Sequence, residues 1–308
     1  MTRFIVIRIM QSIVALIGIM VLVFFLVRAS GDPVDLIRSP NMSEEQVQQI
    51  YIQLGLDKSY PEQLWVYVRG IFRGDLGTSL MKVDPVSDMI GAALPNTLKL
   101  GIPSFIIGMS GAFILGVLAA TRRDSLFDNG VKFLAILGQA LPGFWVGIMA
   151  ILIFYSNLNW VPAPGLGMSL AHYILPVGTM IFFMLPGMMR LVRSTMLDVL
   201  DSEYIKLARI KGLPERTVIW KHALRNALIS PLTVLGMLFA GIVSGAIITE
   251  QIFNWPGMGR LALEATIGRD FPVVQGIVLV VAIMVLGMNL LIDITYAYVD
   301  PQIRYQRA

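Results

Sequence analysis

Six long apolar runs divide this chain, and they constrain its fold more than any other feature. A helix of about 20 apolar residues spans the hydrocarbon core of a bilayer, and within lipid only helices and closed barrels satisfy their own backbone hydrogen bonds. Only 14% of the 308 residues are charged, against roughly 25% in soluble domains. The sequence therefore predicts an all-α membrane protein with six transmembrane helices. The runs are Ile9–Val27, Leu98–Ala120, Phe133–Tyr155, Tyr173–Met189, Leu228–Thr249 and Val273–Ile292.

The first run follows two basic residues, Arg3 and Arg8, as a secretory signal would. It is longer than the roughly 7–15 apolar residues of a signal peptide, and no small-residue cleavage site follows it. We therefore interpret residues 1–28 as a retained first transmembrane helix.

Basic residues set the expected orientation. With the N-terminus in the cytoplasm, most of the 24 Lys and Arg fall on the cytoplasmic side, as the positive-inside rule requires. Both termini are then cytoplasmic, and residues 298–308 form a cytoplasmic tail. The net charge of +4 thus reflects topology, and we expect no nucleic acid among the partners.

The one sizeable polar insertion, residues 29–96, lies outside the membrane in this topology. Ser43 and Gln46 form a capping box for a helix that Gly55 ends, and Pro61 suits the start of a second helix, 62–72. Two short helices cannot build a core of their own. We expect them to lie on the outer surface of the bundle, where they meet a molecule arriving from outside; a plain long connection is the alternative.

The sequence lacks several common nucleotide-binding and catalytic motifs. The sequence has no phosphate-binding G-x-x-x-x-G-K-[ST], no H-E-x-x-H and no G-x-S-x-G, so it offers neither a nucleotide site nor a hydrolase site of those types. It has no cysteine and only two histidines, which this topology places on opposite faces of the membrane; we expect no metal site. Asp293 alone lies well inside a span, as either a functional charge or the partner of a basic residue at the interface.

A basic stretch, Glu203–Leu228, separates the fourth and fifth runs and carries six Lys or Arg against two acidic residues. Ala208 and Gly212 lie four residues apart, which would place both on one face of a helix. Gly212 to Pro214 break that helix, and Glu215 favours the first turn of a second one, ending near Asn226. The pattern predicts a helix–turn–helix that a partner protein or acidic groups contact.

This stretch resembles the EAA loop of permease subunits of binding-protein-dependent ABC importers. E-Y-I-K-L-A-R-I-K-G-L-P with K-H-A-L-R-N-A resembles the dipeptide/oligopeptide/nickel permease family, as do E-Q-I-F-N-W-P-G-M-G-R, R-D-F-P-V-V-Q, V-D-P-Q-I-R-Y, G-D-P, L-G-L-D and G-D-L-G. Together these motifs cover nearly the whole chain in order. Lys206 and Leu207 depart from the usual Glu and Ala, and Leu224-Arg225 replaces Leu-Pro; Arg209 and Lys211 are then expected to supply charge-assisted contacts.

The resemblance implies a type I ABC importer permease of the bacterial cytoplasmic (inner) membrane, with a domain at 97–297 and a coupling loop at about 194–227. A second, similar permease would pair with it, two cytoplasmic ATPase subunits would bind ATP and Mg²⁺, and a periplasmic binding protein would deliver substrate. The chain itself would bind no cofactor and catalyse no reaction. The coupling residues would be Glu203, Lys206, Leu207, Ala208, Arg209, Lys211, Gly212, Leu213, Arg216 and His222. Those of the external gate would be Glu250, Phe253, Trp255, Pro256, Gly257 and Gly259.

The substrate class expected from the resemblance is short peptides: dipeptides, oligopeptides or glutathione-like peptides. A nickel or metal-chelate importer is the alternative within the family, and the sequence contains no feature that separates the two. A stand-alone secondary carrier or channel is the alternative of another class, and it would transport without ATP.

Overall fold

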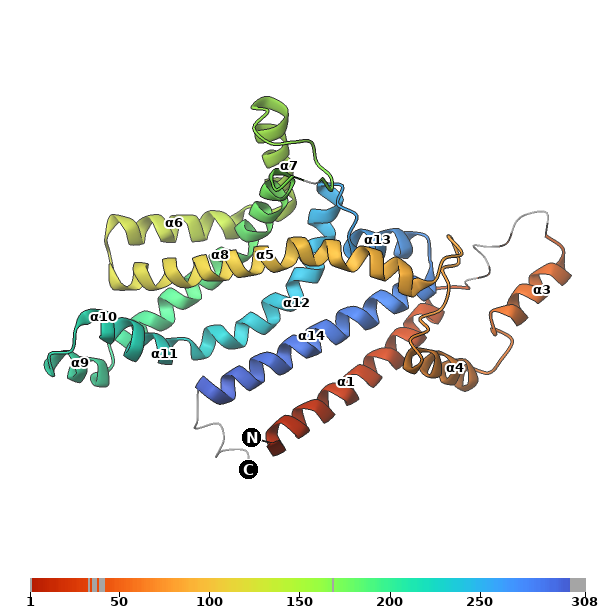
Figure 1. Cartoon of the computed structure of the whole chain (residues 1–308), viewed down its shortest axis with the longest axis horizontal. Helices are drawn as coiled ribbons and strands as arrows, with labels where there is room; N and C mark the ends of the chain where they lie inside the picture. The colour runs from red at the N-terminus through yellow and green to blue at the C-terminus, as the bar shows by residue number, and fades with distance from the viewer. Residues whose placement is uncertain (1, 33, 35–37, 39–41, 168, 300–308) are drawn as a thin grey trace. The chain divides into compact units, whose positions relative to one another are not determined.

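The computed structural model describes the backbone of residues 2–32, 34, 38, 42–167 and 169–299, and the described chain is built of helices and turns (Figure 1). Among these residues the β-pairing is a single isolated bridge between Thr78 and Pro85. The chain divides into two compact units, one of residues 98–255 and 288–308 with 1–2, the other of residues 3–97 and 256–287. Most of the expected tail, residues 300–308, lies outside the described residues.

The first unit contains most of the helices expected in the membrane. They are the end of α5 (Val86–Thr121), α6 (Leu126–Ala140), α7 (Gly143–Ala150) with the π-helix η1 (Ile151–Asn157), α8 (Ala171–Leu200), α9 (Glu203–Ile210), α10 (Glu215–Thr217), the π-helix η2 (Val218–Ala223), α11 (Leu224–Ala227), α12 (Ile229–Ile252) and the end of α14 (Phe271–Val299).

Helix α8 is the centre of this unit, and it packs against α6, α7, α11 and α12. Close approaches at glycine permit this packing: a Cβ on Gly138 of α6 would lie 2.2 Å from Pro186, and one on Gly116 of α5 would lie 2.8 Å from the Met189 carbonyl oxygen. Helix α8 also continues through both Pro176 and Pro186 to Leu200. The expected fourth span, Tyr173–Met189, is thus only part of this helix.

The third expected span, Phe133–Tyr155, is not one straight helix. Helices α6 and α7 meet at a bend of 100° (Figure 1). Leu141, between them, has an extended backbone, because the ring of Pro142 disfavours the helical conformation of the residue before it. An uninterrupted apolar run thus contains a break that its hydrophobicity does not reveal.

Among the residues that the structure describes, four single helices are long and apolar enough to cross a membrane, or five spans if the bent pair counts as one. The four are Ile5–Ala29, Val86–Thr121, Ala171–Leu200 and Phe271–Thr295. Helix α12 lies where the fifth run was expected, and Ile229–Phe239 is a shorter apolar stretch within it.

The second unit contains α1 (Thr2–Ala29), α3 (Glu44–Gln53), α4 (Tyr60–Phe72), the start of α5, α13 (Met258–Ile267) and most of α14. The capping box predicted at Ser43 and Gln46 is confirmed, and Ser59 with Glu62 forms another at the start of α4. The stretch 253–272, which separates the fifth and sixth apolar runs, contains the ten-residue helix α13.

A buried carboxylate closes the loop between α4 and α5 in this unit. Asp270 accepts hydrogen bonds from the Ser79 hydroxyl at 2.5 Å and from the Leu80 amide at 3.1 Å, and both Asp270 and Ser79 are buried. These bonds join the loop to the start of α14.

Candidate functional site

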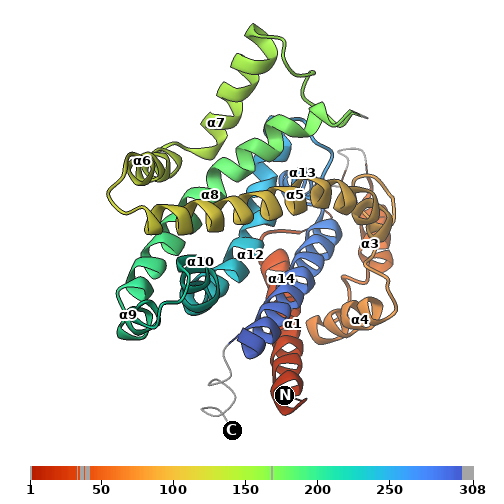
Figure 2. The same cartoon turned by 60° about the vertical axis from the view of Figure 1, so that its left-hand side comes forward.

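The expected coupling loop, about 194–227, includes the last residues of α8, and its part after Leu200, through α9 to α11, is here called the coupling segment. The Ser202 hydroxyl donates to the Val199 carbonyl at 2.5 Å, and the chain turns there into α9, which lies beside η2 (Figure 2). Ile205 is fully buried and anchors the inner face of α9. Tyr204, Leu207 and Ile210 recur every three residues on the opposite face and are exposed, Ile210 by 82%. A short helix is thus fixed to the unit by one face and presents apolar side chains on the other.

The turn after α9 depends on Gly212. This residue has φ +76°, a left-handed conformation that glycine adopts without steric cost. Its amide donates to the Arg209 carbonyl at 2.9 Å, and the Leu213 amide donates to the Ala208 carbonyl at 3.4 Å. This pair of bonds is the Schellman helix end. Gly212 therefore lies just past the end of α9. The sequence prediction that Gly212 and Ala208 share one face of a helix is wrong.

The second arm of the segment runs from Glu215 through α10, η2 and α11. Val218 and Ala223 are buried, and Trp220 is exposed. The predicted second helix is confirmed in position, but a π-helical stretch occupies its middle. Asn226 donates to the Tyr204 hydroxyl at 2.6 Å, which joins the far end of this arm to α9.

Charge pairs stiffen the segment. The Arg209 guanidinium donates to both carboxylate oxygens of Glu215, at 3.2 and 2.7 Å, across the turn. This hydrogen bonding lowers the pKa of Glu215 and raises that of Arg209. Lys206 pairs with Glu203 at 2.7 Å, and hydrogen bonding to that carboxylate raises the pKa of Lys206. Arg209, expected to meet a partner, is therefore engaged within the chain, whereas Lys211 and Arg216 are exposed and His222 is half-buried.

We expect Glu215→Gln to loosen the turn modestly. Arg209 and Glu215 are 40% and 55% exposed, and exposed pairs contribute about 0.2–1 kcal/mol. Because the folded-state pKa of Glu215 lies below its ordinary value of 4.5, the contribution is present above that value and is lost as the pH falls through the folded pKa. Amide hydrogen exchange at Gly212 and Leu213 should rise less than about tenfold, since tenfold corresponds to about 1.4 kcal/mol.

Glu203→Gln is the matched control, because it removes an exposed ion pair that does not bridge the turn. Exchange at Gly212 and Leu213 should stay unchanged in that variant. Equal exchange in Glu215→Gln and wild type would show that the backbone bonds alone close the turn.

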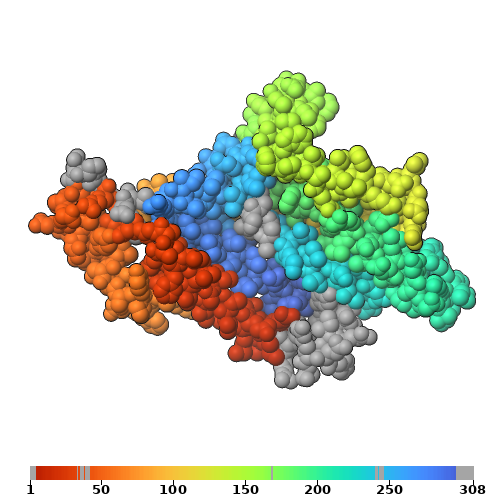
Figure 3. All heavy atoms as spheres, turned by 180° about the vertical axis from the view of Figure 1, so that it is seen from behind, coloured from red at the N-terminus to blue at the C-terminus, as the bar shows by residue number. Residues whose placement is uncertain are grey.

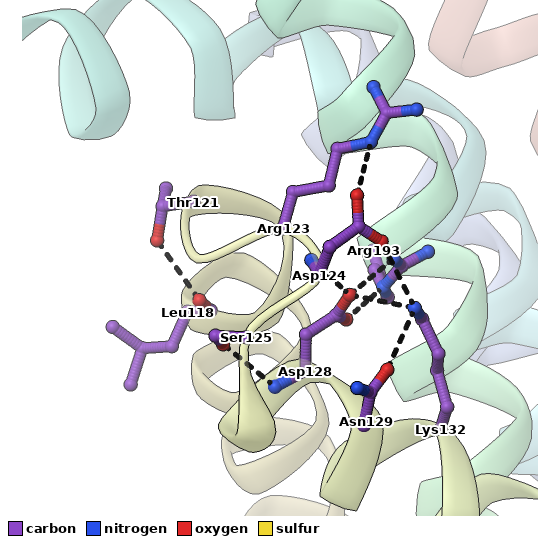
Figure 4. A network of polar contacts seen from close by, with 9 residues as sticks. All are labelled: Leu118, Thr121, Arg123, Asp124, Ser125, Asp128, Asn129, Lys132 and Arg193. Atoms are coloured by element: carbon purple, nitrogen blue, oxygen red, sulfur yellow. Dashed lines mark hydrogen bonds and ion pairs between the residues drawn. The ribbon is translucent and has the colours of Figure 1, made fainter.

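A second polar cluster joins the α5–α6 turn to α8 (Figure 4). Asp128 is fully buried; its carboxylate accepts from Arg193 Nε at 2.5 Å and Nη2 at 2.8 Å, from Lys132 Nζ at 2.9 Å and from the Asp124 amide at 3.0 Å. Two-oxygen pairing of this kind fixes orientation as well as distance. It holds the turn against the half of α8 that leads into the coupling segment.

Our sequence reasoning missed Asp128, although the sequence contained a local signal. Ser125 lies three residues before it, and the Asp128 amide donates to the Ser125 hydroxyl at 3.2 Å as a helix cap. The S-x-x-D spacing marks a helix start, but it does not identify Arg193, 65 residues away, as the partner.

The expected gate residues lie where the two units divide in sequence. In the first unit, Glu250, Phe253 and Trp255 are buried. The Trp255 amide donates to the Glu250 carbonyl at 2.7 Å, and the Trp255 ring packs edge-on against Tyr173 with centroids 5.0 Å apart. The C-terminal end of α12 thus places the aromatic side chains of Phe253 and Trp255 in the protein interior.

In the second unit, the Pro256 carbonyl accepts a hydrogen bond from Asn96 at 3.0 Å. Gly257 precedes the first residue of α13, Met258, whose amide donates to the buried Thr97 hydroxyl at 2.7 Å. Gly259 is buried within α13. These bonds tie the start of α13 to α5.

Asp293 lies in α14, where it is half-buried and has an interaction partner. Among the described residues no group of three or more His, Asp or Glu side chains is arranged to hold a metal ion.

Comparison with known proteins places the chain. The family of binding-protein-dependent transport system inner membrane components matches residues 112–305, and the N-terminal part of such membrane components matches residues 1–101. A putative peptide transport system permease protein of Brucella abortus (strain 2308) is 40% identical and covers 99% of this chain and 100% of its own length.

Two further relatives are 37% identical with the same coverage: the oligopeptide transport system permease protein AppB of Bacillus subtilis (strain 168) and the glutathione transport system permease protein GsiC of Salmonella choleraesuis (strain SC-B67). A chain of the MetNI methionine ABC transporter, in an inward-facing conformation, shares the fold with a TM-score of 0.57 at 16% identity, over 69% of this chain and 96% of that one. Apolar helices and family together make this a multi-pass inner-membrane protein, and the chain belongs to the family of binding-protein-dependent transport system inner membrane components.

Proposed function

We propose that this chain is one of two permease subunits of an ATP-driven importer of short peptides, namely dipeptides, oligopeptides or glutathione-like peptides. Relatives that align over their full length are named for peptide, oligopeptide and glutathione transport, and this favours peptides over a nickel chelate. ATP and Mg²⁺ would bind to two partner ATPase subunits, and a periplasmic binding protein would deliver the peptide.

The proposed topology has six crossings with both termini in the cytoplasm. The four long apolar helices, the bent pair α6–α7 and α12 support that number. Residues 1–28 would form the first crossing, 29–96 the extracytoplasmic segment, 97–297 the remaining transmembrane domain and 298–308 the tail.

The exposed apolar face of α9 is the observation on which the proposed mechanism rests. Tyr204, Leu207 and Ile210 lie on a helix whose other face is anchored by buried Ile205, so a partner that grips this face moves the end of α8 with it. We assign this face to an ATPase subunit, with the exposed charges of Lys211 and Arg216 beside it. ATP-driven closure of the ATPases would then shift α8 and alternate the access of the pathway.

We assign the external gate to the expected residues. Of these, Trp255 is buried at the end of α12. The Pro256 carbonyl accepts a hydrogen bond from Asn96 of α5, and the Met258 amide, next after Gly257, donates to the Thr97 hydroxyl of α5. Asp293 remains a candidate for an intramembrane functional charge.

Reconstitution into vesicles tests the function. The chain, tagged and purified gently with the subunits that accompany it, should take up labelled di- and tripeptides only when ATP and the binding protein are supplied. An excess of unlabelled peptide should compete, and a nickel chelate should not.

Two results would contradict this proposal. Uptake driven by an ion gradient without ATP, from vesicles that contain this chain alone, would indicate a secondary carrier. Competition by a nickel chelate but not by peptides would indicate a metal importer.

A further inference from the structure

Helix α4 is held at one defined level along α1. Arg28 Nε donates to the Gln63 side-chain oxygen at 2.9 Å, and the rings of Phe24 and Tyr67 lie with centroids 5.9 Å apart. Phe24 and Gln63 are both buried. The space-filling view shows α1 and the polar segment that follows it side by side (Figure 3). All these contacts fall within the last two turns of α1.

The level of these contacts follows from the length of α1. Its uncharged apolar run, Ile9–Val27, has 19 residues, or about 28 Å at about 1.5 Å per residue. The hydrocarbon core of a bilayer is about 30 Å thick. The run therefore fills the core, the guanidinium of Arg28 directly after it lies at the headgroups, and α4 lies at that depth with Arg28.

One exposed strip of α4 is apolar. Trp65, Val68 and Phe72 follow the three- and four-residue spacing of one helical face. Trp65 is 67% exposed and Phe72 is 81% exposed, although a large aromatic side chain gains about 1.5–3 kcal/mol on full burial. Tyr67, two residues after Trp65, faces α1 instead, so the apolar strip is separate from the protein contact.

A second exposed strip of α4 is polar. Glu62, Arg69 and Arg73 are exposed and lie seven and four residues apart, which places them on one face. The helix thus has three faces: one on α1, one apolar and one charged. A helix that lies in the interface of a bilayer has its apolar face toward the acyl chains and its charged face toward water.

We propose that α4 is an interfacial helix whose partner is the lipid of the leaflet at the C-terminal end of α1. Trp65 and Phe72 insert at the boundary between headgroups and acyl chains, the depth at which aromatic side chains gather in membrane proteins. Arg69 and Arg73 remain among the headgroups. The helix fixes the depth of α1 and holds the polar segment against the membrane surface. This proposal requires only that α1 spans the bilayer, and it does not depend on the substrate.

Spin-label accessibility tests it, because the chain has no cysteine and each introduced cysteine is a unique site. Trp65→Cys, Phe72→Cys and Gln48→Cys, the last on an exposed position of α3, are labelled in the full complex in lipid nanodiscs. Labels at 65 and 72 should collide more often with oxygen, which dissolves in lipid, than with a water-soluble nickel chelate. The label at 48 should show the reverse.

Two outcomes would overturn the proposal. Preference for the nickel chelate at 65 and 72 would place the strip in water. Low collision rates with both reagents at 65 and 72 would mean that protein covers the strip. If the rates are low in the complex without binding protein, the second permease covers it. If they fall only when the binding protein is added, the binding protein covers it.

A second measurement leaves the side chain in place. Lipids brominated near the headgroup should quench part of the tryptophan fluorescence of the native complex, and Trp65→Phe should reduce that part. An unchanged quenchable fraction in Trp65→Phe would count against insertion even if the cysteine variants failed to assemble.

Discussion

Gly212→Val is expected to reduce peptide uptake and substrate-stimulated ATP hydrolysis about tenfold or more while the chain still inserts and pairs with its partner permease. Gly212 has φ +76°, and left-handed backbone costs an ordinary residue about 1–2 kcal/mol. That is a shift of roughly 5–30-fold in a two-state population, and a β-branched residue is disfavoured further. The turn would open, and the exposed face of α9 would lose its fixed position.

Two milder variants separate the possible reasons for glycine at this position. A Cβ on Gly212 would meet nothing within 4 Å in this chain, so only the backbone or a docked partner excludes side chains. Asn tolerates the left-handed conformation better than Ala does, but it is bulkier. If the backbone decides, Gly212→Asn should transport better than Gly212→Ala; if a docked ATPase decides, the order should invert. Wild-type transport in Gly212→Val would refute the coupling role of the turn.

Asp128→Ala is expected to lower the thermal stability of the chain strongly and to weaken coupling. Removing one partner of a buried ion pair costs about 3–5 kcal/mol, and here the guanidinium of Arg193, only 18% exposed, would lose both of its carboxylate contacts. Lys132 is more exposed and would re-hydrate. Thermal unfolding of the purified complex measures the loss, and the ratio of peptide transported to ATP hydrolysed measures the coupling.

Asp124→Asn is the matched control. Asp124 is a neighbouring carboxylate that is 78% exposed, and its φ of +62° suits Asn, so its loss should change stability by about 1 kcal/mol or less. The apolar pair Asp128→Leu with Arg193→Met tests the ionic character, since such replacements often restore stability. If this double variant regains the stability of the wild type but not its coupling, the ion pair is needed to position α8 for coupling. Unchanged stability in Asp128→Ala would contradict the structure of the cluster.

Features encoded by neighbouring residues were predictable. The Ser43–Gln46 capping box begins α3 at Glu44 as expected, and Gly212 to Pro214 separate two helical arms. A cap or a turn forms among residues a few positions apart, so its signal is local. The apolar runs likewise placed the long helices, because lipid demands a minimum apolar length.

Features that depend on distant partners were not predictable. Pro142 and Pro186 look alike in sequence, yet the chain bends by 100° beside the first and continues as α8 through the second. Pro186 packs against Gly138 of another helix, a contact that a single sequence does not reveal. The burial of Trp255 and the Asp128–Arg193 pair are of the same kind, since burial and pairing follow from how the helices pack.

The coupling segment closes itself almost entirely through its own groups: the Gly212 turn, the Arg209–Glu215 bridge and the bond between Asn226 and Tyr204. Tyr204 takes part in this closure, whereas the side chains of Leu207 and Ile210, exposed on the same face, take part in none of these bonds. If the proposed function holds, substitutions at Leu207 and Ile210 would therefore change which ATPase subunit binds and leave the fold of the segment intact.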